Sequence, residues 1–267
     1  MSLLTISLIQ TNLHWENKAA NLQMLEKKIL QIRQKTQVVI LPEMFSTGFS
    51  MKPALLAETM DGPTVQWMKR MAAEKNIVLT GSVIIKENDL YFNRLIWMLP
   101  TGQLGYYDKR HLFAYGQENQ FYTAGKKRLV ASVNGWKILL LVCYDLRFPV
   151  WSRQQSQNES PEYDLIIYVA NWPEKRVHAW KTLLQARAIE NQCYVAGVNR
   201  VGPDGNHFNH TGDSMVVDPL GALLYHKTGT EDIATVTIEK PALELVRQQF
   251  PFWKDADHFM ILEESVD

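Results

Sequence analysis

One run of the sequence, WKILLLVC at 136–143, is apolar at nearly every position. A strand with one solvated face alternates apolar and polar side chains, whereas a strand covered on both faces is continuously apolar. The run is much too short to span a bilayer of ~30 Å as a helix. We therefore expect a buried strand with further layers of structure on each side of it.

Helical and strand-like segments alternate along the rest of the chain, which is typical of stacked α/β layers. Helices are expected over 21–34 and over 177–192. A further helix is expected to start at Asp61 to Thr64, where Thr64 or Asp61 can cap it and Pro63 suits the first turn. Short polar turns join the strand-like runs in 77–109, and Asn134-Gly135 joins 128–133 to the apolar run, so we predict an antiparallel meander and a hairpin. The remaining strands are expected in 6–10, 38–43, 164–170, 193–200, 213–218, 222–227 and 233–239.

Composition narrows the class of protein. With 267 residues and 46% hydrophobic content, the chain is large enough for one well-buried core, and we expect a single domain over 1–267. The polar stretches 154–162 and 200–212 are expected to be exposed loops rather than linkers. The chain has 28 Lys and Arg residues and 28 Asp and Glu residues, so its formal charges balance. We therefore do not expect nucleic acid as a partner. Without a basic segment and cleavage site at its start, the protein is expected in the cytoplasm, with two free thiols.

Four residues could carry chemistry. Cys143 ends the buried strand, where ligands of α/β sheets collect, although an isolated cysteine is more often a packing residue. Glu43 follows another apolar run and Pro42, and a carboxylate held there could act as a general base. Lys109 closes the run GQLGYYDK and could pair with Glu43, although a solvated lysine is the commoner case. Glu118 lies in a polar, turn-like segment that gives no signal by itself.

Three blocks of sequence contain these residues, and together they resemble the nitrilase superfamily of carbon-nitrogen hydrolases. LPEMFSTGF at 41–49 is similar to the family's glutamate block, YDKRHLF at 107–113 to its lysine block, and LVCYDLRFP at 141–149 to its cysteine block. The resemblance extends over nearly the whole chain. Within the superfamily it is strongest to bacterial ω-amidases, which release ammonia from 2-oxoglutaramate or 2-oxosuccinamate.

The resemblance implies a four-layer αββα sandwich, assembly into a homodimer through packed helices, and neither metal nor organic cofactor. It also implies roles for the residues. Cys143 would be the nucleophile that forms a thioester, Glu43 the general base and acid, and Glu118 the group that orients Lys109. The ammonium of Lys109 and the backbone N–H of Tyr144 would stabilise the oxyanion.

Other polar residues near these blocks have weaker signals. Asn171 and Trp172 follow the strand 164–170 and are expected to line the substrate pocket, although Trp172 could equally be structural. Arg147 could bind a substrate carboxylate, but an ion pair with Asp145 or a glutamate is the expected role. Arg187 and Glu190 are spaced for a salt bridge on one helix.

Alternative functions remain open at this point. His207, His210 and Cys193 do not have the spacing of a metal site, and no phosphate-binding loop is present. The same three catalytic residue types also serve nitrilases and N-carbamoyl hydrolases, so the fold does not choose the substrate. A catalytically silent scaffold is a further alternative, which the presence of Glu43, Lys109 and Cys143 disfavours.

Overall fold

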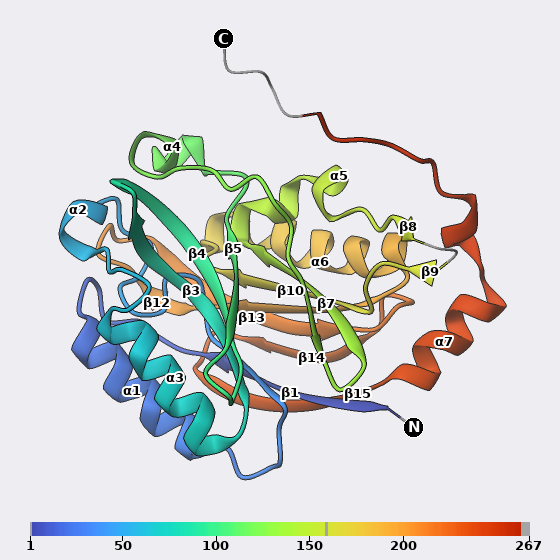
Figure 1. Ribbon diagram of the computed structural model, residues 1–267, viewed down its shortest axis with the longest axis horizontal. Coiled ribbons are helices and arrows are strands. Elements are labelled where there is room, and N and C mark those ends of the chain that lie inside the picture. The colour runs from blue at the N-terminus through green and yellow to red at the C-terminus, as the bar shows by residue number, and fades with distance from the viewer. Residues whose placement is uncertain (1, 158–159, 263–267) are drawn as a thin grey trace.

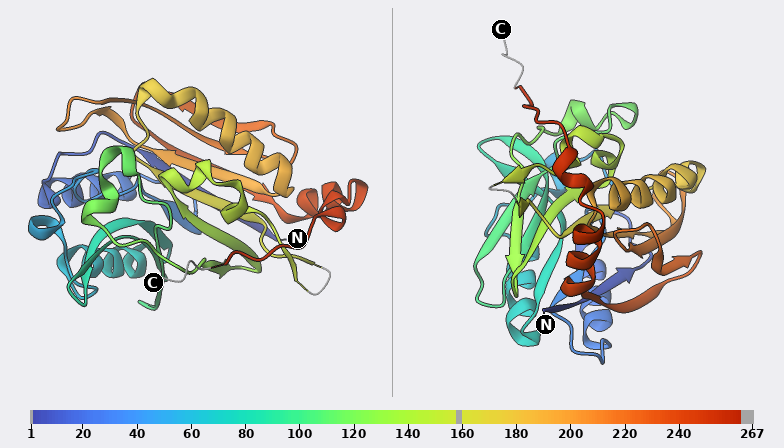
Figure 2. Two further views of the ribbon diagram at one scale, coloured as in Figure 1. Left: turned by 90° about the horizontal axis from the view of Figure 1, so that it is seen from above. Right: turned by 90° about the vertical axis from the view of Figure 1, so that its right-hand side faces the viewer.

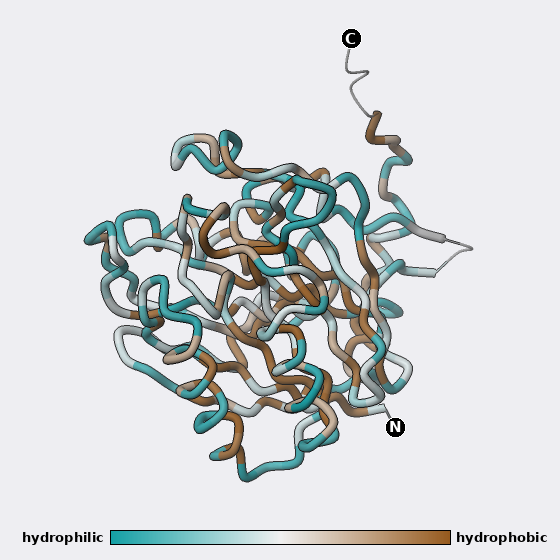
Figure 3. Tube along the Cα trace, turned by 60° about the vertical axis from the view of Figure 1, so that its left-hand side comes forward, coloured by the Kyte–Doolittle hydropathy of each residue, from teal (hydrophilic) through white to brown (hydrophobic). Residues whose placement is uncertain are grey.

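A computed structural model describes residues 2–157 and 160–262 of the protein. Two β-sheets stack face to face, and helices cover their outer faces, which gives the four layers of an αββα sandwich (Figures 1 and 2). Figure 3 shows the hydrophobic segments gathered in the interior and hydrophilic segments in the peripheral loops. No helix within the described ranges is both long and apolar enough to cross a membrane.

The first sheet has six strands in the order β15-β1-β2-β3-β4-β5. Its central strands β1, β2 and β3 are parallel, and helices cross between them as they do in α/β units. The strands β3, β4 and β5 form the predicted antiparallel meander. The elements that belong to this half of the molecule are β1 (Leu3–Gln10), α1 (Lys18–Leu30), β2 (Val38–Ile40), α2 (Pro53–Leu56), α3 (Pro63–Lys75), β3 (Val78–Glu87), β4 (Leu90–Met98), β5 (Leu104–Asp108), η1 (Ala114–Gly116), α4 (Glu118–Phe121) and β15 (Asp232–Glu239).

The second sheet has seven strands in the order β12-β13-β11-β10-β7-β6, with β14 paired to β13. The predicted hairpin of β6 and β7 turns through Asn134 and Gly135, whose φ angles of 49° and 78° suit the turn that joins two twisted strands. The elements of this half are β6 (Val130–Val133), β7 (Trp136–Val142), η2 (Cys143–Arg147), α5 (Pro149–Ser152), β8 (Ser156–Gln157), β9 (Ser160–Pro161), β10 (Leu165–Ala170), η3 (Glu174–Arg176), α6 (Val177–Asn191), β11 (Tyr194–Asn199), β12 (Val201–Pro203), β13 (Asn209–Val217), β14 (Leu223–Thr228), α7 (Lys240–Gln249) and η4 (Phe252–Asp255).

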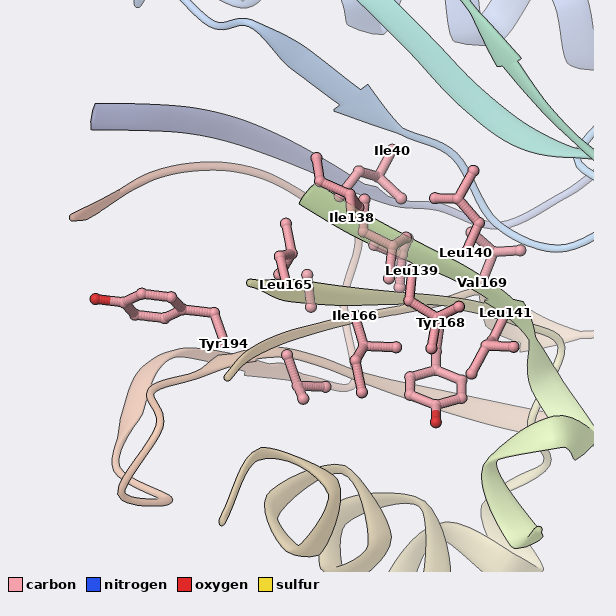
Figure 4. Close-up of a cluster of buried hydrophobic side chains, with 14 of the residues drawn as sticks. Ile40, Ile138, Leu139, Leu140, Leu141, Leu165, Ile166, Tyr168, Val169 and Tyr194 are labelled. Atoms are coloured by element: carbon pink, nitrogen blue, oxygen red, sulfur yellow. The ribbon is translucent and has the colours of Figure 1, made fainter. Parts of the chain in front are cut away.

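The alternation of side chains along the strands explains the layers. In β2, Val38 and Ile40 belong to the hydrophobic cluster between the sheets, whereas Val39 packs with α1 and α3 on the outer side. In Figure 4, Ile166 and Tyr168 of β10 point toward helix α6, and Ile40 lies on the opposite side of the second sheet. Residues 138–142 of the apolar run are therefore buried on both faces, as their composition predicts, whereas Lys137 is exposed.

Several local expectations were wrong. Neither Asp61 nor Thr64 caps α3: Gly62 occupies the N-cap position, and the Thr64 hydroxyl instead donates to Glu58. The stretch 200–212 is not simply a loop, because β12 and the start of β13 form a hairpin there. Gln154, expected in an exposed loop, is buried against Asn191, and the part of that loop at 158–159 lies outside the described residues.

The carboxyl ends of the central strands define the functional edge of the molecule. Strand β2 leads into Glu43, β7 leads into Cys143 and β10 leads into Asn171. Within each sheet these strands run parallel to their central neighbours, so the residues that follow them emerge at a common edge. The two stacked sheets thus bring segments that are about 100 residues apart in sequence to one place.

Candidate active site

A buried ammonium lies between two buried carboxylates at this edge. Lys109 follows β5, and its Nζ lies 2.9 Å from Oε1 of Glu43 and 2.8 Å from Oε2 of Glu118. All three side chains are shielded from solvent. Isolated charges are rarely tolerated in a protein interior, so each of these groups depends on the others. The predicted proximity of Glu43, Lys109 and Glu118 is therefore present, and Glu118 is buried rather than solvated.

Asn93, which was not among the expected site residues, bridges the two carboxylates. Its Nδ2 donates to Oε1 of Glu43 at 2.8 Å and to Oε1 of Glu118 at 3.1 Å. The backbone N–H of Phe113 donates to Oε2 of Glu118 at 2.6 Å. In the sequence of β4, Asn93 is one of two adjacent polar residues, with Arg94, before an apolar stretch, and this pattern does not distinguish it. These donors fix both carboxylates before any substrate is bound.

The electrostatics of the cluster keep Lys109 charged. Burial alone would lower the pKa of Lys109, but the carboxylates of Glu118 and Glu43 outweigh it and raise the pKa above its usual value. Burial raises the pKa of Glu118, an effect that the Lys109 ammonium opposes. The result is a fixed positive charge next to the pocket, held through the neutral pH range.

Cys143 begins the short helix η2 directly after β7. Its φ of 43° is in the left-handed region, which is uncommon for a residue other than glycine and turns the chain sharply after the strand. The residue is partly exposed to the pocket, but the protein atoms around its sulfur still desolvate the thiol. Burial and the Glu43 carboxylate raise the pKa of Cys143 well above its usual value, while Lys109 acts in the opposite direction. A thiol with a raised pKa is protonated at neutral pH, so it needs a base to take its proton when it attacks a substrate.

Asn171 and Trp172 both lie at the pocket, as the sequence analysis predicts, but Asn171 mainly holds Glu43. Its backbone N–H donates to Oε2 of Glu43 at 2.8 Å, and its Nδ2 donates to the Glu43 carbonyl at 2.6 Å. Its buried Oδ1 has no hydrogen-bond partner within the described part of the chain. The Trp172 indole donates to the carbonyl of Arg176 at 2.8 Å, so its orientation is fixed from within the same segment.

These residues line one pocket of about 160 Å³, well below the ~300–1,000 Å³ typical of sites for drug-sized ligands. Tyr144 lies at the pocket with its ring edge-on to Phe113 at 5.0 Å and to Phe148 at 5.1 Å. The full lining consists of Glu43, Phe49, Met51, Lys109, Phe113, Tyr115, Gly116, Cys143, Tyr144, Arg147, Asn171, Trp172, Pro173, Arg176, Asp204, Asn206, Phe208 and His210. A small molecule with a compact reactive group suits this volume.

Asp145 ties the cysteine turn to the lysine segment. Its Oδ2 accepts from the backbone N–H of Val142 at 3.0 Å and from the Tyr107 hydroxyl at 2.8 Å, and its Oδ1 contacts the His111 backbone and ring. The expected ion pair of Arg147 with Asp145 or a glutamate was wrong, because these donors occupy Asp145. The guanidinium of Arg147 instead lies over the Trp172 ring, 5.0 Å from its centroid. The predicted Arg187–Glu190 salt bridge is confirmed at 2.9 Å.

Asp145→Asn should shift the position of the Cys143 turn while leaving Cys143, Glu43 and Lys109 themselves unaltered. Both carboxylate oxygens accept from two donors, so an amide would place an N–H against other donors at one of these positions. We expect the free energy of unfolding to fall by about 1–3 kcal/mol and turnover by roughly tenfold, because the turn at Cys143 shifts. Urea denaturation and the rate of substrate turnover measure the two effects. Asp218→Asn in the β13–β14 turn is the control, and equal losses in both variants would contradict a positioning role for Asp145.

The arrangement can support acyl transfer at a carbonyl carbon. A thiol is placed beside a carboxylate that can exchange protons with it, and a permanent ammonium lies close enough to influence the thiol's pKa. A cation fixed before the reaction stabilises a developing oxyanion without reorganisation, which is often the largest contribution to catalysis. These are the parts needed by a cysteine-dependent hydrolase.

Comparisons with known proteins agree with this chemistry. The sequence model of the carbon-nitrogen hydrolase family matches residues 5–248. The omega-amidase YafV of Escherichia coli is 43% identical over 263 residues, which cover 97% of this chain and 98% of that relative. The 2-oxoglutaramate amidase of Bacillus subtilis is 32% identical over 256 residues, which cover 94% and 96% of the two chains.

Solved structures agree as well. The crystal structure of a carbon-nitrogen hydrolase superfamily protein from Xanthomonas campestris, with an arsenic adduct in its active site, superimposes with a TM-score of 0.95. That protein is 46% identical, and the match covers 98% of this chain and all of the other. The yeast protein Nit3, a nitrilase superfamily member at 24% identity, has the same fold with a TM-score of 0.82 over 94% of this chain and 95% of that one.

Proposed function

The chain belongs to the carbon-nitrogen hydrolase family, and we propose that it is an ω-amidase that hydrolyses the terminal amide of 2-oxoglutaramate or 2-oxosuccinamate. The observation that carries the proposal is the thiol of Cys143, which shares one small pocket with Lys109 and Glu43. The relatives named omega-amidase and 2-oxoglutaramate amidase support this class of substrate.

In the first half of the reaction, Sγ of Cys143 attacks the amide carbonyl carbon while Glu43 takes the thiol proton. The carbonyl oxygen becomes an oxyanion, which the Lys109 ammonium and the backbone N–H of Tyr144 stabilise. Glu43 then gives its proton to the amide nitrogen, the carbon–nitrogen bond breaks, and ammonia leaves a thioester on Cys143. The raised pKa of Cys143 supports a mechanism in which deprotonation accompanies attack rather than precedes it.

In the second half, a water molecule attacks the thioester and Glu43 accepts its proton. The second tetrahedral adduct breaks its carbon–sulfur bond, the thiolate recovers the proton from Glu43, and the carboxylic acid product leaves. Glu118 holds Lys109 in place through both halves, since its two oxygens lie 3.1 and 2.8 Å from Nζ. One carboxylate thus performs every proton transfer, and the other remains a fixed anion.

Product analysis tests the proposal. The purified protein incubated with 2-oxoglutaramate should release ammonia and 2-oxoglutarate in equal amounts, because the reaction adds one water and removes one ammonia. A panel of simple nitriles and N-carbamoyl amino acids serves as the comparison. Carbon dioxide released from a carbamoyl compound, or ammonia from nitriles in preference to the keto amide, would contradict the assignment.

A further inference from the structure

Two arginines line the pocket in addition to the groups used in the mechanism. Arg147 ends η2, the short helix that starts at Cys143, and Arg176 ends η3, five residues after Asn171. Arg147 therefore lies four residues after Cys143, and Arg176 lies in the segment that begins with Asn171, whose backbone N–H binds Glu43. Neither guanidinium takes part in the network of Glu43, Lys109 and Glu118.

Aromatic rings, rather than carboxylates, hold the two guanidinium groups. The Arg147 group lies 5.0 Å from the centroid of Trp172, and the Arg176 group lies 5.1 Å from the centroid of Phe113. Neither forms an ion pair or side-chain hydrogen bond with any carboxylate in the described ranges, in contrast to Arg128, which pairs with Glu162 at 2.7 Å. An arginine packed on a ring is positioned through its face and keeps its N–H donors for another partner.

The carboxylates at the pocket are held by groups other than these two arginines. Glu43 and Glu118 both pair with Lys109. The remaining acidic group of the lining, Asp204, accepts from the backbone N–H groups of Asn206 and Phe208 at 2.8 and 2.9 Å. Burial and the charge of Arg200 lower the pKa of His210 to about 4, so its ring is neutral at pH 7. The two guanidinium groups are thus the cations at the pocket that no carboxylate of the described lining pairs with, and an anionic ligand could take up their N–H donors.

We propose that Arg147 and Arg176 bind the carboxylate of the substrate and so restrict the enzyme to amides of acids. This inference rests on the proposed function, because it places the amide at Cys143 and asks what recognises the other end of the molecule. A guanidinium binds a carboxylate through two parallel N–H···O bonds, which gives orientation as well as affinity. Cys143, Arg147 and Arg176 line the same pocket of about 160 Å³, so a small substrate that reacts at Cys143 occupies the space that both arginines border.

A pair of substrates that differ only in the carboxylate tests the assignment. The anionic substrate is 2-oxoglutaramate, and its neutral counterpart is 4-oxopentanamide, in which a methyl group replaces the carboxylate. Arg147→Gln and Arg176→Gln should each lower kcat/KM for 2-oxoglutaramate by about 10- to 100-fold, mainly through KM, and the double variant should lower it further. Activity toward 4-oxopentanamide should stay within about twofold of the unaltered enzyme.

Lys175→Gln is the matched control, because it removes one positive charge at the residue before Arg176 but lies outside the pocket lining. It should leave kcat/KM for both substrates unchanged. Equal losses for both substrates, or no selective loss for the acid, would overturn the arginine assignment while leaving the proposed function intact. If the unaltered enzyme released no ammonia from 2-oxoglutaramate, the proposed function would fail and this inference with it.

Discussion

Cys143→Ala is expected to lower ammonia release by about 10⁴-fold or more while the protein folds as before. Without the sulfur no thioester can form, and the ammonium of Lys109 then has no covalent adduct to stabilise. The substitution removes one atom from a partly exposed side chain, so the free energy of unfolding should change by less than about 1 kcal/mol. Ammonia release under substrate saturation and thermal unfolding measure the two quantities.

Cys193→Ala is the control for this prediction, because Cys193 is the other free thiol and is buried in the core beside β11. It should reduce stability slightly, through loss of packing, and leave the turnover of the folded enzyme unchanged. If Cys143→Ala kept more than a few per cent of the activity, or if Cys193→Ala abolished it, the assignment of the nucleophile would be wrong.

The layers of the fold could be predicted from sequence because they depend on local patterns. The apolar run 136–143 requires cover on both faces, and the turn signal Asn134-Gly135 specifies a hairpin. The helix α7 was not among the expected elements, although its apolar residues are grouped on one face. Its ten residues bury only Leu243, so a one-sided pattern did not by itself reveal how little of the helix packs against the core.

The candidate site was predictable only in part, and for a related reason. Glu43, Lys109 and Cys143 each occupy a conspicuous position at the end of an apolar or aromatic strand. The bridging role of Asn93 depends instead on contacts with residues 50 positions earlier and 25 positions later. Pairings over such distances are set by how strands assemble, and local spacing carries no information about them.

Arg147 is a case in which closeness in sequence predicted a contact that the structure does not contain. The neighbouring Asp145 suggested an ion pair, since opposite charges two residues apart in a turn are close in sequence. In the structure, the Asp145 carboxylate instead accepts hydrogen bonds from the Tyr107 hydroxyl and from the backbone N–H groups of His111 and Val142. The guanidinium that remains becomes available to a ligand because its expected partner is already occupied.

Glu43→Gln is expected to change catalysis and thiol ionisation in opposite directions. Turnover should fall by about 10³- to 10⁴-fold, because an amide accepts no proton in either half of the reaction. The pKa of the Cys143 thiol should nevertheless fall. A neighbouring negative charge raises the pKa of an acid, so removal of the Glu43 charge makes proton loss easier, and Lys109 continues to favour the thiolate.

The ultraviolet absorbance of the thiolate, followed against pH, measures this shift. Burial raises the pKa of Cys193 as well as that of Cys143, so the difference from the Cys143→Ala titration isolates the signal of Cys143. Glu174→Gln, which removes a carboxylate from the surface near Asn209, should alter neither the titration nor the turnover. A Glu43→Gln enzyme that gains thiolate at neutral pH but loses activity would show that the reaction is limited by proton transfer rather than by the amount of thiolate. Retained activity would instead require a base other than Glu43.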